Sequence, residues 1–198
     1  MRAVTTVTGR AYPFGQSDVD TDVIIAAEWL KALTREGMGS GVFAELRRDR
    51  DTVFDDSRFA DAPILIAGRN FGCGSSREHA VWALLDFGIE VVIAPSFSDI
   101  FLGNAFKNGL LTIVLDQATV CHLLDVAKTA TITVDLPNQT ITTSLKDCFA
   151  FAFDSFRKHC LLHGLDEIAL TLASAADISS HERRYSRERN FYAKLDMG

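Results

Sequence analysis

The sequence predicts an α/β fold with a parallel sheet core, an added β-hairpin and C-terminal helices. Between residues 63 and 128, short apolar runs alternate with segments of helical periodicity, which is typical of βαβ units. After residue 130 the period changes, and apolar and polar residues alternate on both sides of Pro137-Asn138, as in a β-hairpin. A helical pattern over 155–174 follows.

The N-terminal part of the chain predicts one strand and two short helices. Residues 3–8 are rich in β-branched types and predict a strand. Side chains at 20–22 are suited to cap a short helix at the start of the apolar stretch 23–30. Residues 31–41 contain three glycines and are expected to form a mobile loop, before a short helix over 42–48.

The centre of the chain supplies the sheet. Apolar runs of strand length predict strands buried on both faces, as in a parallel sheet. The expected order is strand 63–68, helix 77–87, strand 90–94, helix 97–107, strand 110–115 and helix 117–128.

The C-terminal part predicts a hairpin, a further strand and two helices. Their expected ranges are 131–136 and 139–145 for the hairpin, 148–153 for the strand, and 155–174 for two helices broken near Gly164. From residue 181 the chain carries five basic and three acidic residues. We therefore expect a single domain over 1–180 and a basic tail over 181–198.

Composition excludes several classes of function. A net charge of −6 argues against general nucleic-acid binding, which needs clustered Lys and Arg. No apolar run approaches the ~18 residues of a membrane span, and residues 1–15 lack the apolar region of a secretory signal, so a cytoplasmic protein is expected. The cysteines at 73, 121, 148 and 160 form no CxxC pair and give no ligand set for a metal. Of these, Cys121, Cys148 and Cys160 are expected to be buried.

The densest chemical signal is the segment NFGCGSSREH at 70–79, between a buried strand and a helix. Ligands of open α/β sheets bind at such strand ends, where helix N-termini present free N–H groups. Gly72 and Gly74 allow the backbone to approach a ligand closely. Because Arg77 can grip a carboxylate through two N–H groups, the segment predicts a site for a small anionic molecule.

Two other interpretations of this segment stay open. Cys73 and His79 could form a nucleophile and its base. Alternatively the segment is structural, with Ser75 and Ser76 capping the helix and Arg77 paired with Glu78 or another nearby acid.

The segment and its neighbours resemble one known family. NFGCGSSREHAVWALLDFGI, VVIAPSFSDIF and NAFKNGLL are similar to the small subunits of 3-isopropylmalate dehydratase, in the aconitase superfamily. DVDTDVII near the N-terminus and FRKHCLLHGLDEIALTL near the C-terminus resemble the bacterial form of that subunit. The resemblance covers residues 3–175.

The resemblance implies a swivelling β/β/α domain and a hydro-lyase that is active only with a large subunit. The substrate would be a small dicarboxylate, isomerised between 2-isopropylmalate and 3-isopropylmalate through 2-isopropylmaleate in leucine biosynthesis. This chain would bind no cofactor itself, and a [4Fe–4S] cluster would sit on the partner large subunit. Two alternatives stay open: a subunit of a related hydro-lyase acting on dimethylmalate, citraconate or homoaconitate, and a non-catalytic paralogue that binds a large subunit.

The resemblance also implies roles for individual residues. Ser75 would be the base, Ser76 would complete its hydrogen-bonded pocket, and Arg77 with the Gly74 turn would bind a substrate carboxylate. Asp22 would orient catalytic groups, unless it is only a helix cap. In the matching KNG segment, Lys107 and Asn108 either contact substrate or end a helix.

Substrate selectivity is expected to lie in residues 28–38. The apolar side chains in this stretch are suited to line a pocket for an isopropyl group, or else they pack the core of the domain. They are Trp29, Leu30, Leu33 and Met38.

Overall fold

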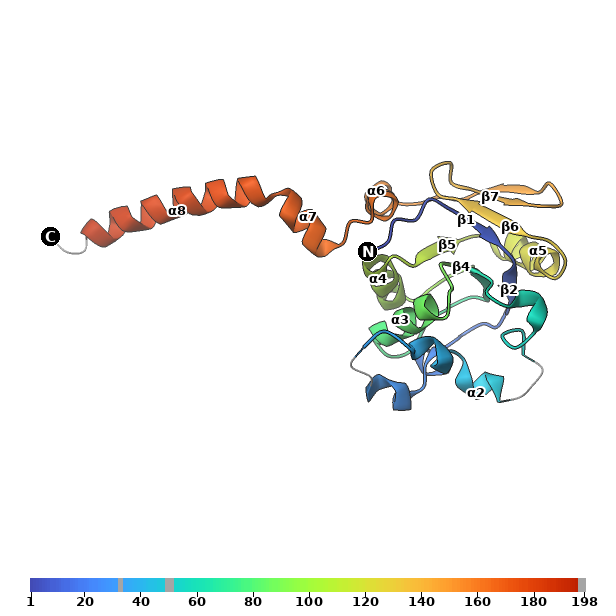
Figure 1. The fold of residues 1–198 in the computed structure, drawn as a ribbon. Helices are drawn as coiled ribbons and strands as arrows, with labels where there is room; N and C mark the ends of the chain where they lie inside the picture. The colour runs from blue at the N-terminus through green and yellow to red at the C-terminus, as the bar shows by residue number, and fades with distance from the viewer. Residues whose placement is uncertain (32–33, 49–51, 196–198) are drawn as a thin grey trace. The chain divides into compact units, whose positions relative to one another are not determined.

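The computed structural model describes residues 1–31, 34–48 and 52–195. The chain forms two compact units, Met1–Gly164 and Leu165–Gly198. In the described residues, the first unit contains two four-stranded sheets (Figure 1).

One sheet is parallel, and it confirms the three central strands that the sequence predicts. Its spatial order is β2 (Ala11–Pro13), β3 (Ile64–Ile66), β4 (Val91–Ala94) and β5 (Leu111–Val114). In register, Leu65 lies opposite Val92, which lies opposite Thr112. Strand β2 is not among the predicted strands, because its three residues include Pro13, which cannot donate to a ladder. Such a residue is tolerated here because β2 is the edge strand.

The other sheet is antiparallel and contains the predicted hairpin. Its order is β1 (Thr6–Gly9), β6 (Ile132–Asp135), β7 (Thr140–Thr143) and β8 (Cys148–Ala150). Val134 pairs with Ile141 on β7 and with Val7 on β1. Buried and partly buried residues alternate along β6 and β7, which is the period that distinguished this region in the sequence.

The helices after residue 77 follow the predicted ranges closely, whereas the short helix expected within 23–30 is replaced by a helix over Thr21–Ile24 and a separate 3-10 turn. In the first unit they are α1 (Thr21–Ile24), α2 (Ala44–Arg47), α3 (Glu78–Asp86), α4 (Asp99–Asn108), α5 (Gln117–Ala127) and α6 (Ser155–His163). Short 3-10 turns occupy Ala27–Lys31, Met38–Gly41 and Ser57–Phe59. Helices α4 and α6 end at Gly109 and Gly164, both with positive φ.

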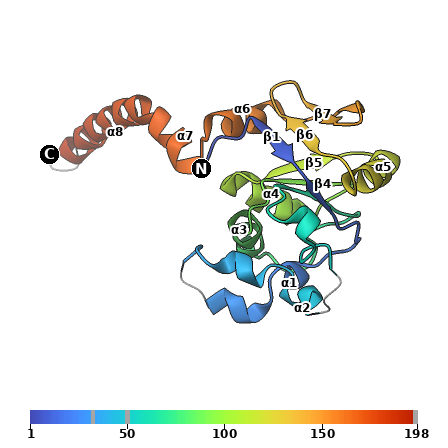
Figure 2. The ribbon, with the colours of Figure 1, turned by 45° about the vertical axis from the view of Figure 1, so that its right-hand side comes forward.

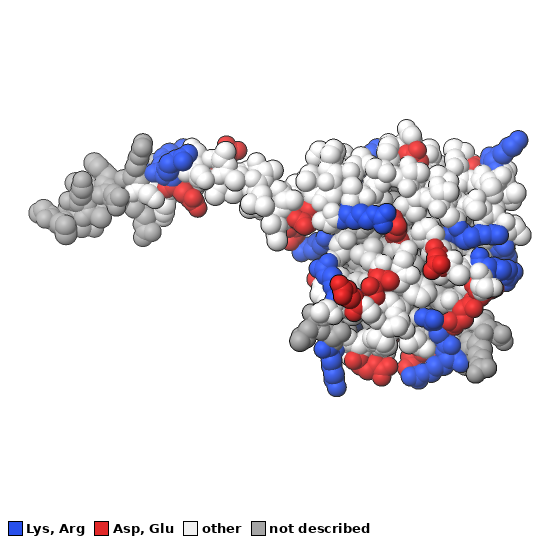
Figure 3. All heavy atoms as spheres, in the orientation of Figure 1, with Lys and Arg blue, Asp and Glu red and all other residues white. Residues whose placement is uncertain are grey.

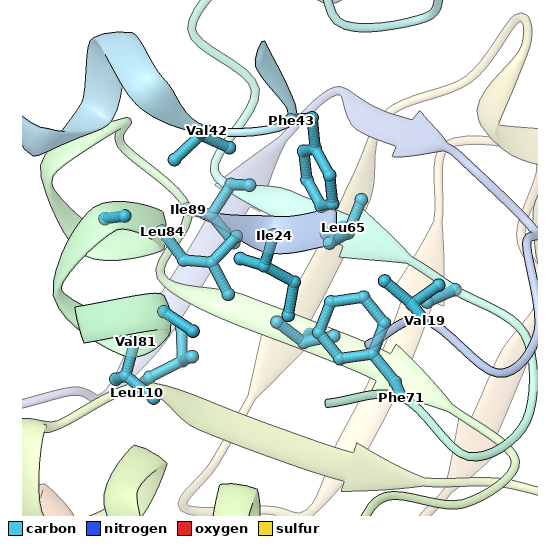
Figure 4. Packing of buried hydrophobic residues seen from close by; sticks show 14 of the residues in the cluster. Val19, Ile24, Val42, Phe43, Leu65, Phe71, Val81, Leu84, Ile89 and Leu110 are labelled. Carbon is cyan, nitrogen blue, oxygen red and sulfur yellow. The ribbon is translucent and has the colours of Figure 1, made fainter. Parts of the chain in front are cut away.

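The parallel sheet separates two hydrophobic cores. Alternate side chains of a strand point to opposite faces, so Leu65 and Val92 belong to one core and Ile64 and Val91 to the other. The first core packs the sheet against α1, α3 and α4, and Figure 4 shows its close packing. The second packs the sheet against β6, β7 and α5. The first unit is therefore a β/β/α arrangement, with α1 and α2 on the helical side of the sheet (Figure 2).

The second unit consists of α7 (Glu167–Ala173) and α8 (Ala175–Leu195). Residues 180 and 181, where the sequence predicts the start of a tail, both lie inside α8. The division of the chain at residue 180 stays a prediction. Within the described ranges, no helix has the length and apolarity needed to cross a bilayer.

The structure shows how surface charge is distributed and which cysteines are buried. On the face drawn in Figure 3, Lys and Arg side chains of the first unit are interspersed with Asp and Glu. Cys160 is buried as expected, but the prediction of burial is wrong for Cys121 and Cys148, which are exposed. Helix α5 buries Val120 and Leu123, so Cys121 between them faces outward, and Cys148 lies on the edge strand β8.

Candidate functional site

The site is built where two segments, 18–25 and 69–77, run side by side. The Thr21 N–H donates to the Cys73 carbonyl at 2.9 Å, and the Gly72 N–H donates to the Val19 carbonyl at 2.9 Å. Asp20 and Cys73 form an isolated parallel bridge. These bonds bring the DTD segment, with Asp22, to the turn that holds Ser75 and Arg77.

The turn follows β3 and has two glycines in the left-handed region. Gly72 has φ 73° and Gly74 has φ 87°. A Cβ on Gly72 would lie 2.3 Å from the Phe101 ring, and one on Gly74 would lie 2.3 Å from the Asp20 carboxylate. The sequence suggested that these glycines make room for a ligand. In the structure the chain's own Phe101 and Asp20 occupy the side on which a Cβ would point, and the close approach of a ligand to this backbone stays a prediction.

Ser75 and Ser76 lie ahead of α3 and are both exposed. The N-cap of α3 is Arg77, and no side chain caps it, so the interpretation in which the serines cap this helix is wrong. Neither serine hydroxyl has a hydrogen-bond partner among the described residues. Both hydroxyls are therefore available to a molecule from outside the chain.

Arg77 forms an ion pair with Asp22 through its Nη1 atom. The Arg77 side chain is only 20% exposed and the Asp22 side chain 50% exposed. Asp22 is not the cap of α1, because Asp20 fills that role by accepting from the Asp22 N–H at 2.8 Å. The acid that pairs with Arg77 is thus the residue that the resemblance assigns to the site.

The geometry does not support a Cys73–His79 pair. Burial, with the negative charge of Asp20 nearby, raises the pKa of the Cys73 thiol, which disfavours the reactive thiolate. The His79 ring packs on Trp82, with 4.7 Å between the ring centroids. No hydrogen bond joins Cys73 to His79 in the described structure.

Asn108 is used inside the fold. Its side chain accepts from Trp82 Nε1 at 3.0 Å and donates to Glu78 Oε1 at 2.7 Å and to the Asn104 carbonyl at 2.9 Å. This network joins the end of α4 to α3, the helix that follows the turn. Of the two roles open for Asn108, its contacts support the structural one.

The apolar residues proposed for selectivity are divided. Trp29 is half-buried, and its indole packs so closely on Gly41 that a Cβ there would lie 2.5 Å away. Met38 is fully buried in the first core, so it packs the core of the domain and does not line a pocket. Leu30 is half-buried, and Leu33 lies outside the described residues. The pocket role of Trp29, Leu30 and Leu33 stays a prediction.

Sequence reasoning missed two residues of this region, Asp20 and Thr21. Both were assigned only as possible helix caps. In the structure the Asp20 carboxylate also packs on Gly74, and the buried Thr21 hydroxyl donates to the Ser75 carbonyl at 3.0 Å. The signal available in the sequence was the polar Thr21 beside an apolar run, but its partner is 54 residues away.

Comparisons with known proteins agree on one family. The family model "Aconitase C-terminal domain" matches residues 1–118. A "3-isopropylmalate dehydratase small subunit" of Novosphingobium aromaticivorans is 58% identical over 194 residues, covering 98% of this chain and 96% of that one. A protein of the same name from Zymomonas mobilis is 59% identical, covering 92% and 95%.

A solved structure gives the same result. The crystal structure of 3-isopropylmalate dehydratase from Methanocaldococcus jannaschii matches with a TM-score of 0.68 and 28% identity, covering 89% of this chain and 99% of that one. The chain therefore belongs to the 3-isopropylmalate dehydratase small subunits, a branch of the aconitase C-terminal domain family.

Proposed function

We propose that this chain acts, together with a large subunit, as a cytoplasmic hydro-lyase of leucine biosynthesis. The reaction is the dehydration of 2-isopropylmalate to 2-isopropylmaleate and its rehydration to 3-isopropylmalate. The observation that carries the proposal is the ion pair of Asp22 with Arg77, which lies two residues along the chain from the exposed Ser75, in a chain of this family.

In this proposal Ser75 Oγ removes the substrate proton. Serine is a weak base in water, so its alkoxide needs positive potential around it. Helix α3 begins three residues after Ser75, and its N-terminal N–H groups supply part of that potential. Arg77 supplies the rest, and Ser76 contributes a further donor to the pocket.

In this proposal Arg77 binds a substrate carboxylate, and Asp22 orients the Arg77 guanidinium. A guanidinium has five N–H donors in a planar fork, which matches a carboxylate. The buried Nη1 atom of Arg77 faces the Asp22 carboxylate, and we propose that the remaining N–H groups of the guanidinium bind a substrate carboxylate. The backbone of Gly74 borders the same place.

The residues of this chain do not fit a cluster site. In the described ranges, no group of three or more His, Cys, Asp or Glu side chains could hold a metal ion, and two of the four cysteines are exposed on separate elements. As the family resemblance implies, we propose that a [4Fe–4S] cluster on the large subunit would supply the Lewis acid for the departing hydroxyl.

The test uses the purified chain and a large subunit of the same family, separately and mixed. The absorbance of the unsaturated intermediate reports turnover of 2-isopropylmalate. We expect each subunit alone to be inactive, this chain to be colourless, and the mixture to be active. Faster turnover of dimethylmalate, citraconate or homoaconitate would assign a related hydro-lyase instead. Assembly without turnover of any of the four would contradict a catalytic role.

A further inference from the structure

Thr21 is a buried polar residue whose hydroxyl reaches the catalytic turn. It is 2% exposed, and in the described chain the only other buried polar residue is Thr143. Its hydroxyl donates to the Ser75 carbonyl at 3.0 Å, across 54 residues of sequence, and the neighbouring Asp20 carboxylate is a second, more distant acceptor at 3.4 Å. Burying a hydroxyl without a hydrogen bond costs free energy, so the bond to Ser75 compensates for the burial of Thr21.

The backbone around Thr21 is fixed at both of its polar groups. Its N–H donates to the Cys73 carbonyl at 2.9 Å, and its carbonyl accepts from the Ile25 N–H at 3.0 Å. The donor hydroxyl is thus attached to the first turn of α1, whose backbone is fixed, and it holds the Ser75 carbonyl in a defined place.

Residues 75 and 76 make few other hydrogen bonds among the described residues. The Ser75 carbonyl also accepts from the Arg77 N–H at 2.8 Å, but that bond is local. In the part of the chain that the structure describes, the Thr21 hydroxyl makes the one hydrogen bond that ties residues 75–76 to another segment. Gly74, immediately before, has φ 87° and packs against the Asp20 carboxylate, but that contact is not a hydrogen bond to residues 75–76.

We propose that Thr21 is a positioning residue, whose hydroxyl fixes the Ser75 peptide so that Ser75 Oγ keeps the orientation needed to remove a proton. The inference rests on the proposed role of Ser75 as base. Loss of the hydroxyl leaves Arg77 and Asp22 in place but frees the Ser75 peptide. Small misplacements of a reacting group cost on the order of 100-fold in rate, so the effect belongs in kcat and not in KM.

Thr143 offers a matched control. Its buried hydroxyl donates to the Asp147 carboxylate at 2.7 Å in the antiparallel sheet, away from the two segments of the site. A Thr→Val change removes one buried hydroxyl at either position with little change in shape. Thr21→Ser keeps the hydroxyl and tests rescue.

The variants are assayed as complexes with the large subunit. We expect Thr21→Val to lower kcat by about 10–100-fold with KM within about 2-fold, and Thr21→Ser and Thr143→Val to stay within about 3-fold of the parent. Wild-type kcat in a folded, assembled Thr21→Val complex overturns the proposal. If Thr21→Val does not fold, Thr21→Cys, whose thiol is a weak donor, must show the loss in kcat, and a retained kcat overturns the proposal equally.

A double-mutant cycle separates positioning from general structure. If Thr21 acts through Ser75, Thr21→Val has no further effect on the residual rate of Ser75→Ala, whereas independent effects multiply. Multiplying effects overturn the positioning role. A fully active Ser75→Ala refutes the base assignment itself. An inactive Ser75→Ala beside a fully active Thr21→Val refutes only the role of Thr21.

Discussion

Gly74→Ala tests whether Asp20 and the turn at residues 72–76 are packed as tightly as the structure shows. Gly74 has φ 87°, and a Cβ there would lie 2.3–2.4 Å from three atoms of the Asp20 carboxylate. Asp20 cannot yield freely, because it caps α1 through the Asp22 N–H. The substitution therefore forces either the turn or the cap to move.

The expected cost has two parts. A side chain in the left-handed region costs ~1–2 kcal/mol. Displacing Asp20 from its cap adds ~0.5–2 kcal/mol. Gly37→Ala isolates the first part, since Gly37 has φ 84° and no atom within 4 Å of its added Cβ. We expect Gly74→Ala to destabilise by ~0.5–2 kcal/mol more than Gly37→Ala, which is the cost of the displaced cap.

Urea unfolding of the isolated subunit measures both variants. The two tryptophans, Trp29 and Trp82, lie in the first unit, so their fluorescence reports that unit. Asp20→Ala in the Gly74→Ala background removes the clash, so the two effects should be less than additive. Equal destabilisation by Gly74→Ala and Gly37→Ala, or full additivity with Asp20→Ala, would refute the packing argument.

Three further predictions concern activity of the assembled enzyme. Ser75→Ala should lower kcat by about 10²–10⁴-fold while the subunits still assemble in gel filtration, because only the base is lost; near-normal turnover would show that another group takes the proton. Arg77→Lys should raise KM by more than about 10-fold, because an ammonium cannot replace the planar fork that Asp22 orients; an unchanged KM would remove Arg77 from substrate binding. Exchanging residues 28–38 for those of a subunit from another pathway should shift the ratio of kcat/KM between the two substrates by about 10–200-fold; an unchanged ratio would assign selectivity to the large subunit.

The fold was predictable where one local signal decides the structure. Strands β3, β4 and β5 are uninterrupted apolar runs, and α4 and α6 end at glycines, so short windows of sequence define them. Strand β2 gave no such signal, because three residues ending in Pro13 acquire strand geometry only by pairing with β3. Likewise β-branched residues predicted β1 but not its pairing with β6, which lies more than 120 residues away.

The candidate site shows the same limit at the level of single residues. Ser75 and Arg77 could be predicted from one contiguous motif, and Asp22 from the resemblance. That Asp20 packs on Gly74 and Thr21 bonds to Ser75 depends on two distant segments lying side by side, which no pattern in either segment encodes. The average burial of cysteine does not predict the exposure of Cys121, because its exposure depends on which face of α5 it occupies.

Because alternate strand side chains enter different cores, a substitution in the parallel sheet disturbs the packing of one core or of the other, depending on its position. A methylene removed from Ile64 or Val91 opens a void toward the antiparallel layer, whereas one removed from Leu65 or Val92 opens a void toward the helices of the first core. Helix α4 contacts both layers, because Phe101 and Ala105 lie in the first core and Phe106 packs against the second. Repacking the antiparallel layer therefore leaves the first core unchanged only where Phe106 keeps its contacts.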